Sequence, residues 1–243
     1  MISIQDVYGG YGGLDILSNF GITVEEGSIN CIVGPNGAGK STVLKTLSGV
    51  LRPRRGSIVV DGVELVGMSP TNIIRAGIVQ VPQRHGLFPT LTVRQNVMMG
   101  GYVDRRAGSR LRARYEELAG LFPLIAQRST ERAGSLSGGQ RRIVEFARAM
   151  MLEPKVVLLD EPTLGLDPNS RGVIHESTRA MNATGTTILM VEQNVRFGLS
   201  LADRVTVMSA GSVVLEGTAA EIADHPDLMG LFFGHAPNSQ VQG

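Results

Sequence analysis

Eight consecutive residues near the N-terminus have the composition and spacing needed to hold a chain of phosphates. They match the pattern G-x-x-x-x-G-K-[ST] in full: Gly34, Pro35, Asn36, Gly37, Ala38, Gly39, Lys40 and Ser41. Glycines let backbone N–H groups wrap the phosphates, and a helix that begins near Lys40 adds the positive end of its dipole. Lys40 would contact the β- and γ-phosphates, Ser41 would bind Mg²⁺, and Thr42 would support the α-phosphate. The alternative is a glycine-rich turn that binds nothing.

Two carboxylates follow a run of four apolar residues at 156–159, which reads as a buried strand. Asp160 and Glu161 emerge at the C-terminal end of this strand, the edge where open α/β sheets place ligands. Asp160 is placed to orient a hydrated Mg²⁺, and Glu161 to polarise an attacking water as general base. Alone the pattern is weak, because many strands end in an acidic cap. Together with Lys40 and Ser41 it predicts hydrolysis of a bound nucleotide.

A third motif opens a predicted helix upstream of that strand. Its residues are Leu136, Ser137, Gly138, Gly139 and Gln140. Ser137 can cap a helix that starts on two glycines, which is the structural interpretation. The functional interpretation uses the same geometry, because a glycine-rich helix start offers backbone N–H groups to an anion.

These three motifs, in this order, resemble those of ABC-type ATPases, in which L-S-G-G-Q is the signature. The resemblance covers about residues 2–234. It implies an α/β fold: a P-loop NTPase (RecA-like) core with an N-terminal antiparallel β part and an inserted helical subdomain. It also implies a dimer with ATP and Mg²⁺ at its seam, since the signature of one subunit closes on the γ-phosphate held by the other.

The resemblance assigns roles to four more residues. Tyr11 matches an aromatic that stacks on adenine, although it could be an ordinary turn tyrosine. Gln83 matches a glutamine that contacts Mg²⁺ or water and links the core to the helical lobe. Asp167 matches the D-loop, which crosses the dimer seam, and it could equally cap the following helix. Gln193 stands where most members have a histidine that contacts the γ-phosphate.

The run Val-Glu-Gln-Asn at residues 191–194 resembles the ATPase subunits of importers for branched-chain amino acids, urea and amides. The ending at residues 231–235 resembles the same group, whereas residues 83–85 depart from its usual Glu-Gly-Arg. The resemblance implies an ATPase that powers solute uptake. Its implied partners are a second ATPase subunit (in a heterodimer or a homodimer), two membrane permeases that dock beside residues 84–100, and, indirectly, an extracytoplasmic solute-binding protein.

Three alternatives to this function stay open. The chain could serve an ABC transporter for another cargo or for export, or it could be a scaffold that binds ATP and barely hydrolyses it. It could also be a non-transport ABC ATPase that acts on DNA or ribosomes. Such proteins usually carry long coiled coils or two fused cassettes, and this chain shows one phosphate motif and no heptad run.

The elements that must position these residues alternate between strand and helix on both sides of a helical middle. Strands are expected at residues 2–8, 16–24, 29–33, 57–60, 78–81, 156–159, 186–191, 205–208 and 213–215. Helices are expected at residues 41–48, 93–99, 111–122, 138–151, 169–182 and 195–202. This order predicts parallel strands joined by crossover helices. The predicted nucleotide-binding core comprises residues 1–83 and 156–235, the helical signature subdomain residues 84–155, and a disordered tail residues 236–243.

The composition limits the class of protein. The chain has 243 residues, 42% of them apolar, which suffices for one large α/β domain. The net charge of +1 argues against nucleic acid as the main partner. The single cysteine, Cys31, excludes an intrachain disulfide and is expected to be a buried apolar residue. Because no secretory signal and no run of roughly 18 apolar residues occurs, we expect a cytoplasmic protein on the inner face of the cell membrane, docked through other subunits.

A basic cluster lies in the middle of the chain. It consists of Arg105, Arg106, Arg110, Arg112 and Arg114. These side chains could face anionic lipid headgroups or an acidic loop of a membrane subunit. The other interpretation, which we favour, is a solvated helix face.

The glutamine at position 193 leads to a first prediction. Glutamine can donate a hydrogen bond to a phosphate oxygen, but it neither becomes a cation nor relays a proton near neutral pH. We therefore expect the site built around Lys40 to turn over more slowly than one with histidine. Gln193→His should raise the ATPase rate of the assembled complex, and an unchanged or lower rate would contradict this expectation.

Overall fold

The computed structural model describes residues 1–84, 86–104, 107–228 and 230, which fall into two units. The first unit comprises Met1–Met68 with Leu189–Gly243, and the second comprises Ser69–Ile188. Arg105 and Arg106 of the basic cluster, the ending at residues 231–235 and the predicted tail at 236–243 lie outside the described residues.

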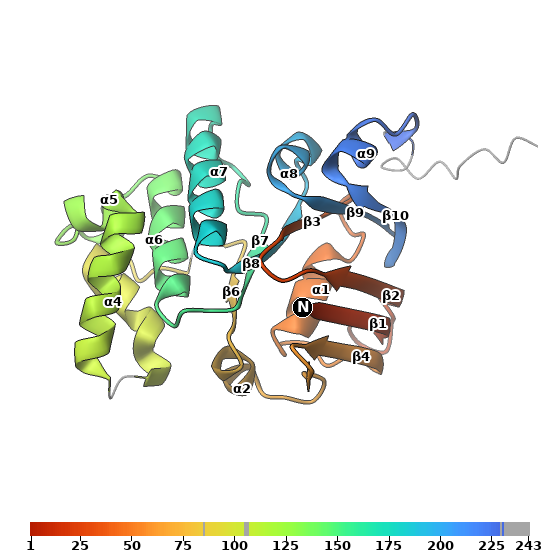
Figure 1. The fold of residues 1–243 in the computed structure, drawn as a ribbon, viewed down its shortest axis with the longest axis horizontal. Helices are drawn as coiled ribbons and strands as arrows, with labels where there is room; N and C mark the ends of the chain where they lie inside the picture. Colours follow the sequence, from red (N-terminus) through yellow and green to blue (C-terminus); the bar gives the residue numbers. More distant parts are fainter. Residues whose placement is uncertain (85, 105–106, 229, 231–243) are drawn as a thin grey trace, which may run out of the picture. The chain divides into compact units, whose positions relative to one another are not determined.

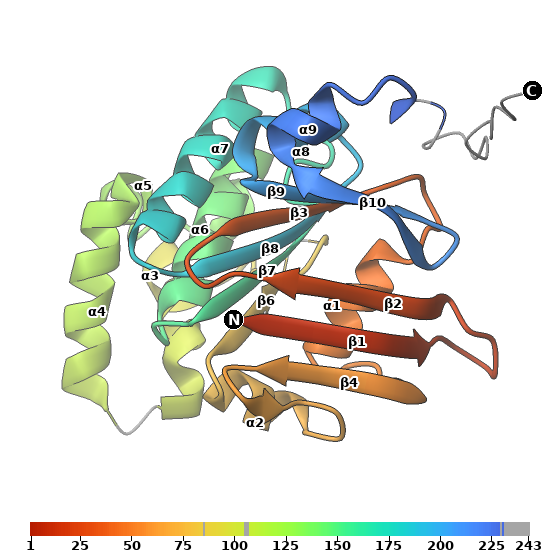
Figure 2. The ribbon, with the colours of Figure 1, turned by 45° about the vertical axis from the view of Figure 1, so that its right-hand side comes forward.

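A four-stranded antiparallel sheet forms the N-terminal part of the first unit (Figure 2). Its order is β2-β1-β4-β5, with bounds β1 (Ile2–Gly9), β2 (Leu17–Val24), β4 (Arg55–Val60) and β5 (Val63–Glu64). Along β2, buried Phe20, Ile22 and Val24 are separated by more exposed residues, because successive side chains of a strand point to opposite faces. The predicted antiparallel β part is therefore confirmed.

Further strands of the first unit run in the order β10-β9-β3-β8. Their bounds are β3 (Ile29–Val33), β8 (Thr187–Glu192, in this unit from Leu189 on), β9 (Arg204–Ser209) and β10 (Ser212–Thr218). All five residues of β3 are buried, and β3 pairs in parallel with β9. Continuous apolar runs of this kind are typical of parallel strands covered on both faces. The helices of this unit are α1 (Lys40–Leu47), α8 (Val195–Leu201) and α9 (Ala219–Ala223).

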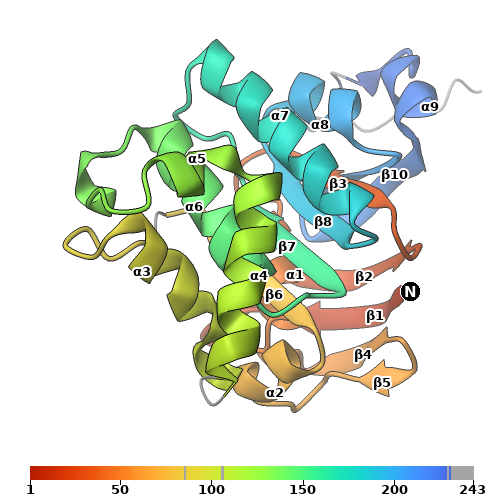
Figure 3. The same cartoon turned by 60° about the vertical axis from the view of Figure 1, so that its left-hand side comes forward.

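The second unit contains two parallel strands, β6 (Ile78–Val81) and β7 (Val156–Asp160), and mostly helices otherwise (Figure 3). The α-helices are α2 (Pro70–Arg75), α3 (Val93–Met98), α4 (Gly108–Leu121), α5 (Pro123–Gln127), α6 (Gly138–Met150) and α7 (Pro168–Ala183). Short 3-10 segments occupy Met99–Asp104 and Ala133–Ser135. Within the described stretches, no helix is both long and apolar enough to cross a bilayer.

The expected α/β class is confirmed, and each helix predicted from the sequence lies at its expected place to within about three residues. Helices α2 and α5 are absent from the predicted elements, and their six and five residues give little helical period. In the described residues of the predicted helical subdomain at 84–155, the named elements are helices and 3-10 segments (Figure 1), and one isolated β-bridge joins Thr92 to Arg132. The boundaries of this subdomain remain a prediction, since the second unit extends further on both sides.

Tyr115 on α4 is a central residue of the helical packing, and only 1% of its surface is exposed. Its hydroxyl donates a 2.8 Å hydrogen bond to the carbonyl oxygen of Ile125 on α5. The guanidinium of Arg94 lies 4.4 Å from the ring centroid. Burial raises the pKa of the phenol, and the neighbouring Arg94 cation acts in the opposite direction. The side chain therefore joins α3, α4 and α5.

Removing this hydroxyl should destabilise the fold measurably. Tyr115→Phe leaves the Ile125 carbonyl without its buried donor, which should lower the free energy of unfolding by about 1–3 kcal/mol. Urea denaturation followed by circular dichroism measures this difference. Tyr102→Phe is the matched control, because Tyr102 is 59% exposed and its change should stay within about 0.5 kcal/mol. Equal effects of both substitutions would contradict the prediction.

Candidate functional site

The predicted phosphate loop connects β3 to α1 in the first unit. Gly37 and Gly39 have φ angles of 82° and 100°, which favour glycine because other residues are strained there. A Cβ atom on Gly34 would lie 2.2 Å from the carbonyl oxygen of Met208. The loop conformation therefore requires glycine at these positions for steric reasons alone.

Lys40, the first residue of α1, is 5% exposed and folds back over this loop. Its ammonium donates hydrogen bonds to the carbonyl oxygens of Gly34 at 2.8 Å and Pro35 at 3.0 Å. Ser41 and Thr42 follow in the first turn of the helix, where backbone N–H groups and the helix dipole favour an anion. Binding of a phosphate chain by this loop and Lys40 stays a prediction.

Tyr11 lies in the turn between β1 and β2, and 45% of its surface is exposed. Lys45 on α1 donates a 3.1 Å hydrogen bond to its hydroxyl, and the same ammonium lies 5.4 Å from the ring centroid. The structure thus joins this tyrosine to the helix that follows the phosphate loop. An exposed aromatic ring beside that helix suits stacking on a base, and the adenine role remains a prediction.

Gln193 lies between β8 and α8 and is exposed to solvent. Its neighbours are anchored, since Glu192 is 2% exposed and the side chain of Asn194 caps α8 by accepting from the Phe197 N–H. Cys31 of β3 is buried as expected. Burial, and secondarily the Glu192 carboxylate, raises the pKa of its thiol well above the usual value.

The second unit holds the predicted carboxylates. Strands β6 and β7 pair in parallel with Val81 opposite Leu159, so the residues that follow them leave from the same edge. Asp160 and Glu161 are 6% and 7% exposed. The Gln83 amide donates a 2.7 Å hydrogen bond from Nε2 to Oε2 of Glu161. The structure therefore brings the predicted glutamine directly onto the predicted general base.

The signature (residues 136–140) opens α6 with a capping box. Ser137 Oγ accepts from the Gln140 N–H at 3.3 Å, and Gln140 Oε1 accepts from the Ser137 N–H at 3.0 Å. The two glycines are close to the segment that precedes and begins α7. Cβ atoms added to them would lie 3.1 Å from Leu166 (at Gly138) and 2.9 Å from the Ser170 hydroxyl (at Gly139). The structural interpretation of Ser137 is thus confirmed, and its role toward a second subunit stays a prediction.

Asp167 caps α7. Its carboxylate accepts from the Ser170 N–H at 3.0 Å and from the Ser170 hydroxyl at 2.5 Å. These hydrogen bonds, the one from the hydroxyl first, lower the pKa of the Asp167 carboxyl. Because Ser170 also lies beside Gly139, the cap of α7 and the start of α6 share one contact. The predicted D-loop role across a dimer seam stays a prediction.

Three residues of α6 that were not predicted hold the backbone around Gln83. Arg142 donates to the carbonyl oxygens of Pro82 and Gln83, both at 2.8 Å. Glu145 accepts from the Gly86 N–H at 2.6 Å, and Arg148 donates to the Gly86 carbonyl oxygen at 2.6 Å. Burial lowers the pKa of the Arg148 guanidinium, and Glu145 acts in the opposite direction. We call residues 82–84 and 86 the Q-loop segment.

The sequence contains a weak signal for a buried ion pair on α6. Arg142 and Glu145 stand three residues apart, the spacing of neighbours on one helix face. They alternate with Ile143, Val144 and Phe146, which predict a helix buried on most sides. Charged residues of opposite sign within such a helix indicate a buried pair.

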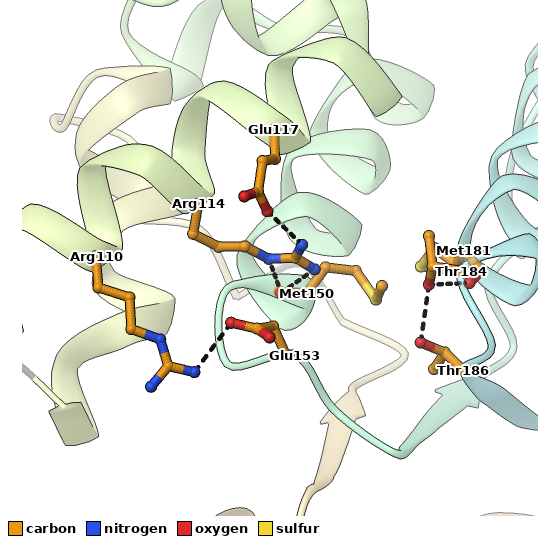
Figure 4. Close-up of polar contacts among 8 residues, drawn as sticks. All are labelled: Arg110, Arg114, Glu117, Met150, Glu153, Met181, Thr184 and Thr186. Carbon is orange, nitrogen blue, oxygen red and sulfur yellow. Dashed lines mark hydrogen bonds and ion pairs between the residues drawn. The ribbon is translucent and has the colours of Figure 1, made fainter.

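Two of the three described arginines of the basic cluster, Arg110 and Arg114, have partners within the second unit (Figure 4). Arg110 pairs with Glu153 at 3.0 Å, and Arg114 pairs with Glu117 at 2.9 Å. Arg114 also donates to the Met150 carbonyl oxygen at the end of α6, at 3.2 and 3.1 Å. These two side chains connect α4 to neighbouring elements, as a structural role requires.

Two of the predicted magnesium ligands, Ser41 and Asp160, carry oxygen donors, each within its own unit, and their shared binding of one ion stays a prediction. Mg²⁺ usually takes one or two carboxylates and completes its shell with water and substrate phosphates. Asp160 offers a carboxylate at the end of β7, and Ser41 offers a hydroxyl at the start of α1. Across the described part of the chain, no group of three or more His, Cys, Asp or Glu side chains is arranged to hold a metal alone.

Comparisons with known proteins agree with this picture. The ABC transporter family matches residues 17–164. The branched-chain amino acid transport ATP-binding protein BraG of Pseudomonas aeruginosa is 37% identical over 96% of this chain and 100% of that protein. BraF of the same organism, which has the same description, is 31% identical over 93% of this chain and 94% of that protein.

The fold is confirmed by a solved structure, the ADP conformation of an ATP-binding cassette of an ABC transporter. It superposes with a TM-score of 0.87 over 96% of this chain and 98% of that chain, at 23% identity. The predicted P-loop NTPase core is thus confirmed.

Removing the buried lysine should weaken nucleotide binding. Lys40→Ala deletes the cation that is expected to contact the phosphates, which should lower the affinity for ATP by about ten- to a hundredfold. Titration with a fluorescent ATP analogue in the presence of Mg²⁺ measures the dissociation constant. Lys155→Ala, in the second unit, is the control and should bind like the wild type. If both variants bound with wild-type affinity, Lys40 would have no role in phosphate binding.

Proposed function

Since the chain belongs to the ABC transporter family and is an ATP-hydrolysing subunit of such a transporter, we propose that it powers the uptake of branched-chain amino acids or similar small polar solutes across the cytoplasmic membrane. The observation that carries the proposal is the similarity to BraG, which extends over the whole of that protein. The run Val-Glu-Gln-Asn at residues 191–194, which ends β8 and leads into α8, supports the same group of importers.

We assign the binding of ATP to the first unit. Backbone N–H groups of residues 34–41 surround the phosphates, Lys40 contacts the β- and γ-phosphates, and Thr42 supports the α-phosphate. The Lys40 ammonium already has two carbonyl partners, which phosphate oxygens can replace as stronger, charge-assisted acceptors. Tyr11 stacks on the adenine, and Gln193 donates a hydrogen bond to the γ-phosphate.

Hydrolysis is assigned to Glu161 as general base. Its carboxylate accepts the Gln83 amide, so one of its oxygens already has a donor while the other can accept the proton of the attacking water. Gln83 thereby orients the carboxylate. Ser41, Gln83 and Asp160 would hold Mg²⁺, which supplies charge neutralisation at the phosphates.

We propose that a second ATPase subunit completes the site. The signature presents the start of α6, with Ser137 and Gly138 accessible and Gly139 packed inward, to the γ-phosphate held by that subunit. Asp167 and Ser170 connect the same surface to α7. In Pseudomonas aeruginosa two different proteins, BraG and BraF, are each described as ATP-binding proteins of branched-chain amino acid transport. This favours a heterodimer.

Two permease subunits are proposed to dock on the second unit beside the Q-loop segment. Three large apolar side chains are exposed there: Phe88 at 48%, Met99 at 40% and Tyr102 at 59%. Phe88 and Met99 line a pocket of about 260 Å³ together with Glu145 and Arg148. Exposed apolar residues around a pocket are typical of a protein interface. Such docking would hold the chain at the inner face of the membrane.

Transport by the reassembled complex tests this function. The chain, its second ATPase, two permeases and the solute-binding protein are reconstituted in vesicles, and ATP-driven uptake of labelled leucine is measured.

Glu161→Gln should bind ATP with wild-type affinity and lower the turnover of its own site by about a hundredfold or more. Glu176→Gln on α7 is the control, because it makes the same chemical change at an exposed carboxylate. Its turnover should equal that of the wild type. Near-normal turnover in Glu161→Gln would show that Glu161 is not the general base. ATP hydrolysis without leucine uptake would contradict the proposed cargo.

A further inference from the structure

We propose that the buried ion pair Arg142–Glu145 on α6 positions Gln83 against Glu161, so that the helix that begins with the signature controls the general base. The inference rests on the proposed roles of Gln83 and Glu161. Neither Arg142 nor Glu145 is proposed to contact the reacting atoms, and we therefore describe both as positioning residues.

The pair is buried more deeply than stability alone would favour. The side chains of Arg142 and Glu145 are 2% and 0% exposed, and their N–O distance is 2.9 Å. Removing two charges from water is costly, and apolar residues of similar volume often stabilise a fold as well or better. A role beyond folding therefore has to be sought in what the two side chains bind.

Both members of the pair bind backbone on either side of the Gln83 side chain. Arg142 donates through Nη1 to the Pro82 carbonyl and through Nη2 to the carbonyl of Gln83 itself. Glu145 accepts from the Gly86 N–H. Three hydrogen bonds from this pair thus hold the backbone at Pro82, Gln83 and Gly86.

The fixed backbone determines where the Gln83 side chain can reach. Its Nε2 lies 2.7 Å from Oε2 of Glu161, and the amide of a half-buried glutamine keeps this contact only while its Cα stays in place. Glu161 has a φ of 46°, in the left-handed region, so the geometry of the base is itself constrained. A displacement of about 1 Å at a catalytic group can lower a rate by about a hundredfold.

The other end of the connection is the signature. Arg142 lies four residues after Gly138, about 6 Å along the same helix. Because an α-helix moves as a rigid rod over such a distance, any displacement of the helix start moves Arg142, and with it the Q-loop segment. Gly138 also lies close to Leu166 in the loop before α7, and Gly139 lies close to Ser170 in the first turn of α7.

The test replaces the pair by apolar residues, since single truncation would leave a buried charge. In the reconstituted complex, Arg142→Met combined with Glu145→Leu should keep wild-type ATP affinity and an unchanged or higher unfolding temperature, while kcat falls at least about tenfold. Amide exchange at Gly86 should become faster because its N–H loses its acceptor. A purely structural pair would leave kcat unchanged in a stable variant.

Arg114→Met is the matched control. This arginine also donates two hydrogen bonds to a backbone carbonyl of the α6 helix, but at Met150, the far end (Figure 4). Its substitution should leave kcat and the exchange of Gly86 unchanged. A loss of kcat equal to that of the double variant would overturn the inference, because the effect would then be general to the packing of α6.

A double-mutant cycle with Gln83→Ala tests whether the effect passes through the glutamine. In the Gln83→Ala background the apolar pair should lower kcat no further, since its target is gone. An equal fall in both backgrounds, or wild-type kcat in the double variant, would overturn the inference. If the wild-type complex hydrolysed no ATP, the proposed function would fail instead, while unchanged exchange at Gly86 in the double variant would still overturn the positional link.

Discussion

The parallel pairing of β6 and β7 is the constraint on which the chemistry of the second unit depends. Since Val81 lies opposite Leu159, the chain leaves both strands at one edge, and Gln83 and Glu161 meet two residues later. This register also brings the Q-loop segment within reach of α6, whose charged face then holds it from Pro82 to Gly86. A shift of one residue in either strand would turn these side chains to the opposite face and separate the amide from the carboxylate.

Each unit contains a buried cation that is bonded to backbone carbonyl groups. In the first, the Lys40 ammonium donates hydrogen bonds to two carbonyl oxygens of the loop that it is expected to serve. Neutral carbonyl oxygens are weaker acceptors than the charged oxygens of a phosphate, so a bound nucleotide can replace them. In the second, Arg142 has a full carboxylate partner in Glu145 and two carbonyls in addition.

Much of the fold and of the site could be predicted because the necessary signals are local. Residues 34–41, the carboxylates after β7 and the glycines that open α6 owe their behaviour to neighbours within a few positions, as caps, turns and strand ends do. The α/β order followed from hydrophobic periods, which missed short elements such as α2 and the two-residue strand β5. The hydrogen bonds from α6 to the Q-loop segment could not be predicted. Glu145 and Gly86 are far apart in sequence, and their contact depends on tertiary packing. The same reason leaves Gln193 and Asp167 with roles that only a bound partner would display.

The single thiol of the chain gives the first unit a natural reporter. Cys31 is 1% exposed in the strand that leads into the phosphate loop, and burial keeps it protonated. An alkylating reagent can reach this sulfur only in molecules whose first unit has opened, because reactivity needs both access and the thiolate. The rate of labelling therefore measures local opening of one half of the chain without an introduced probe, and any ligand that tightens the loop would slow it.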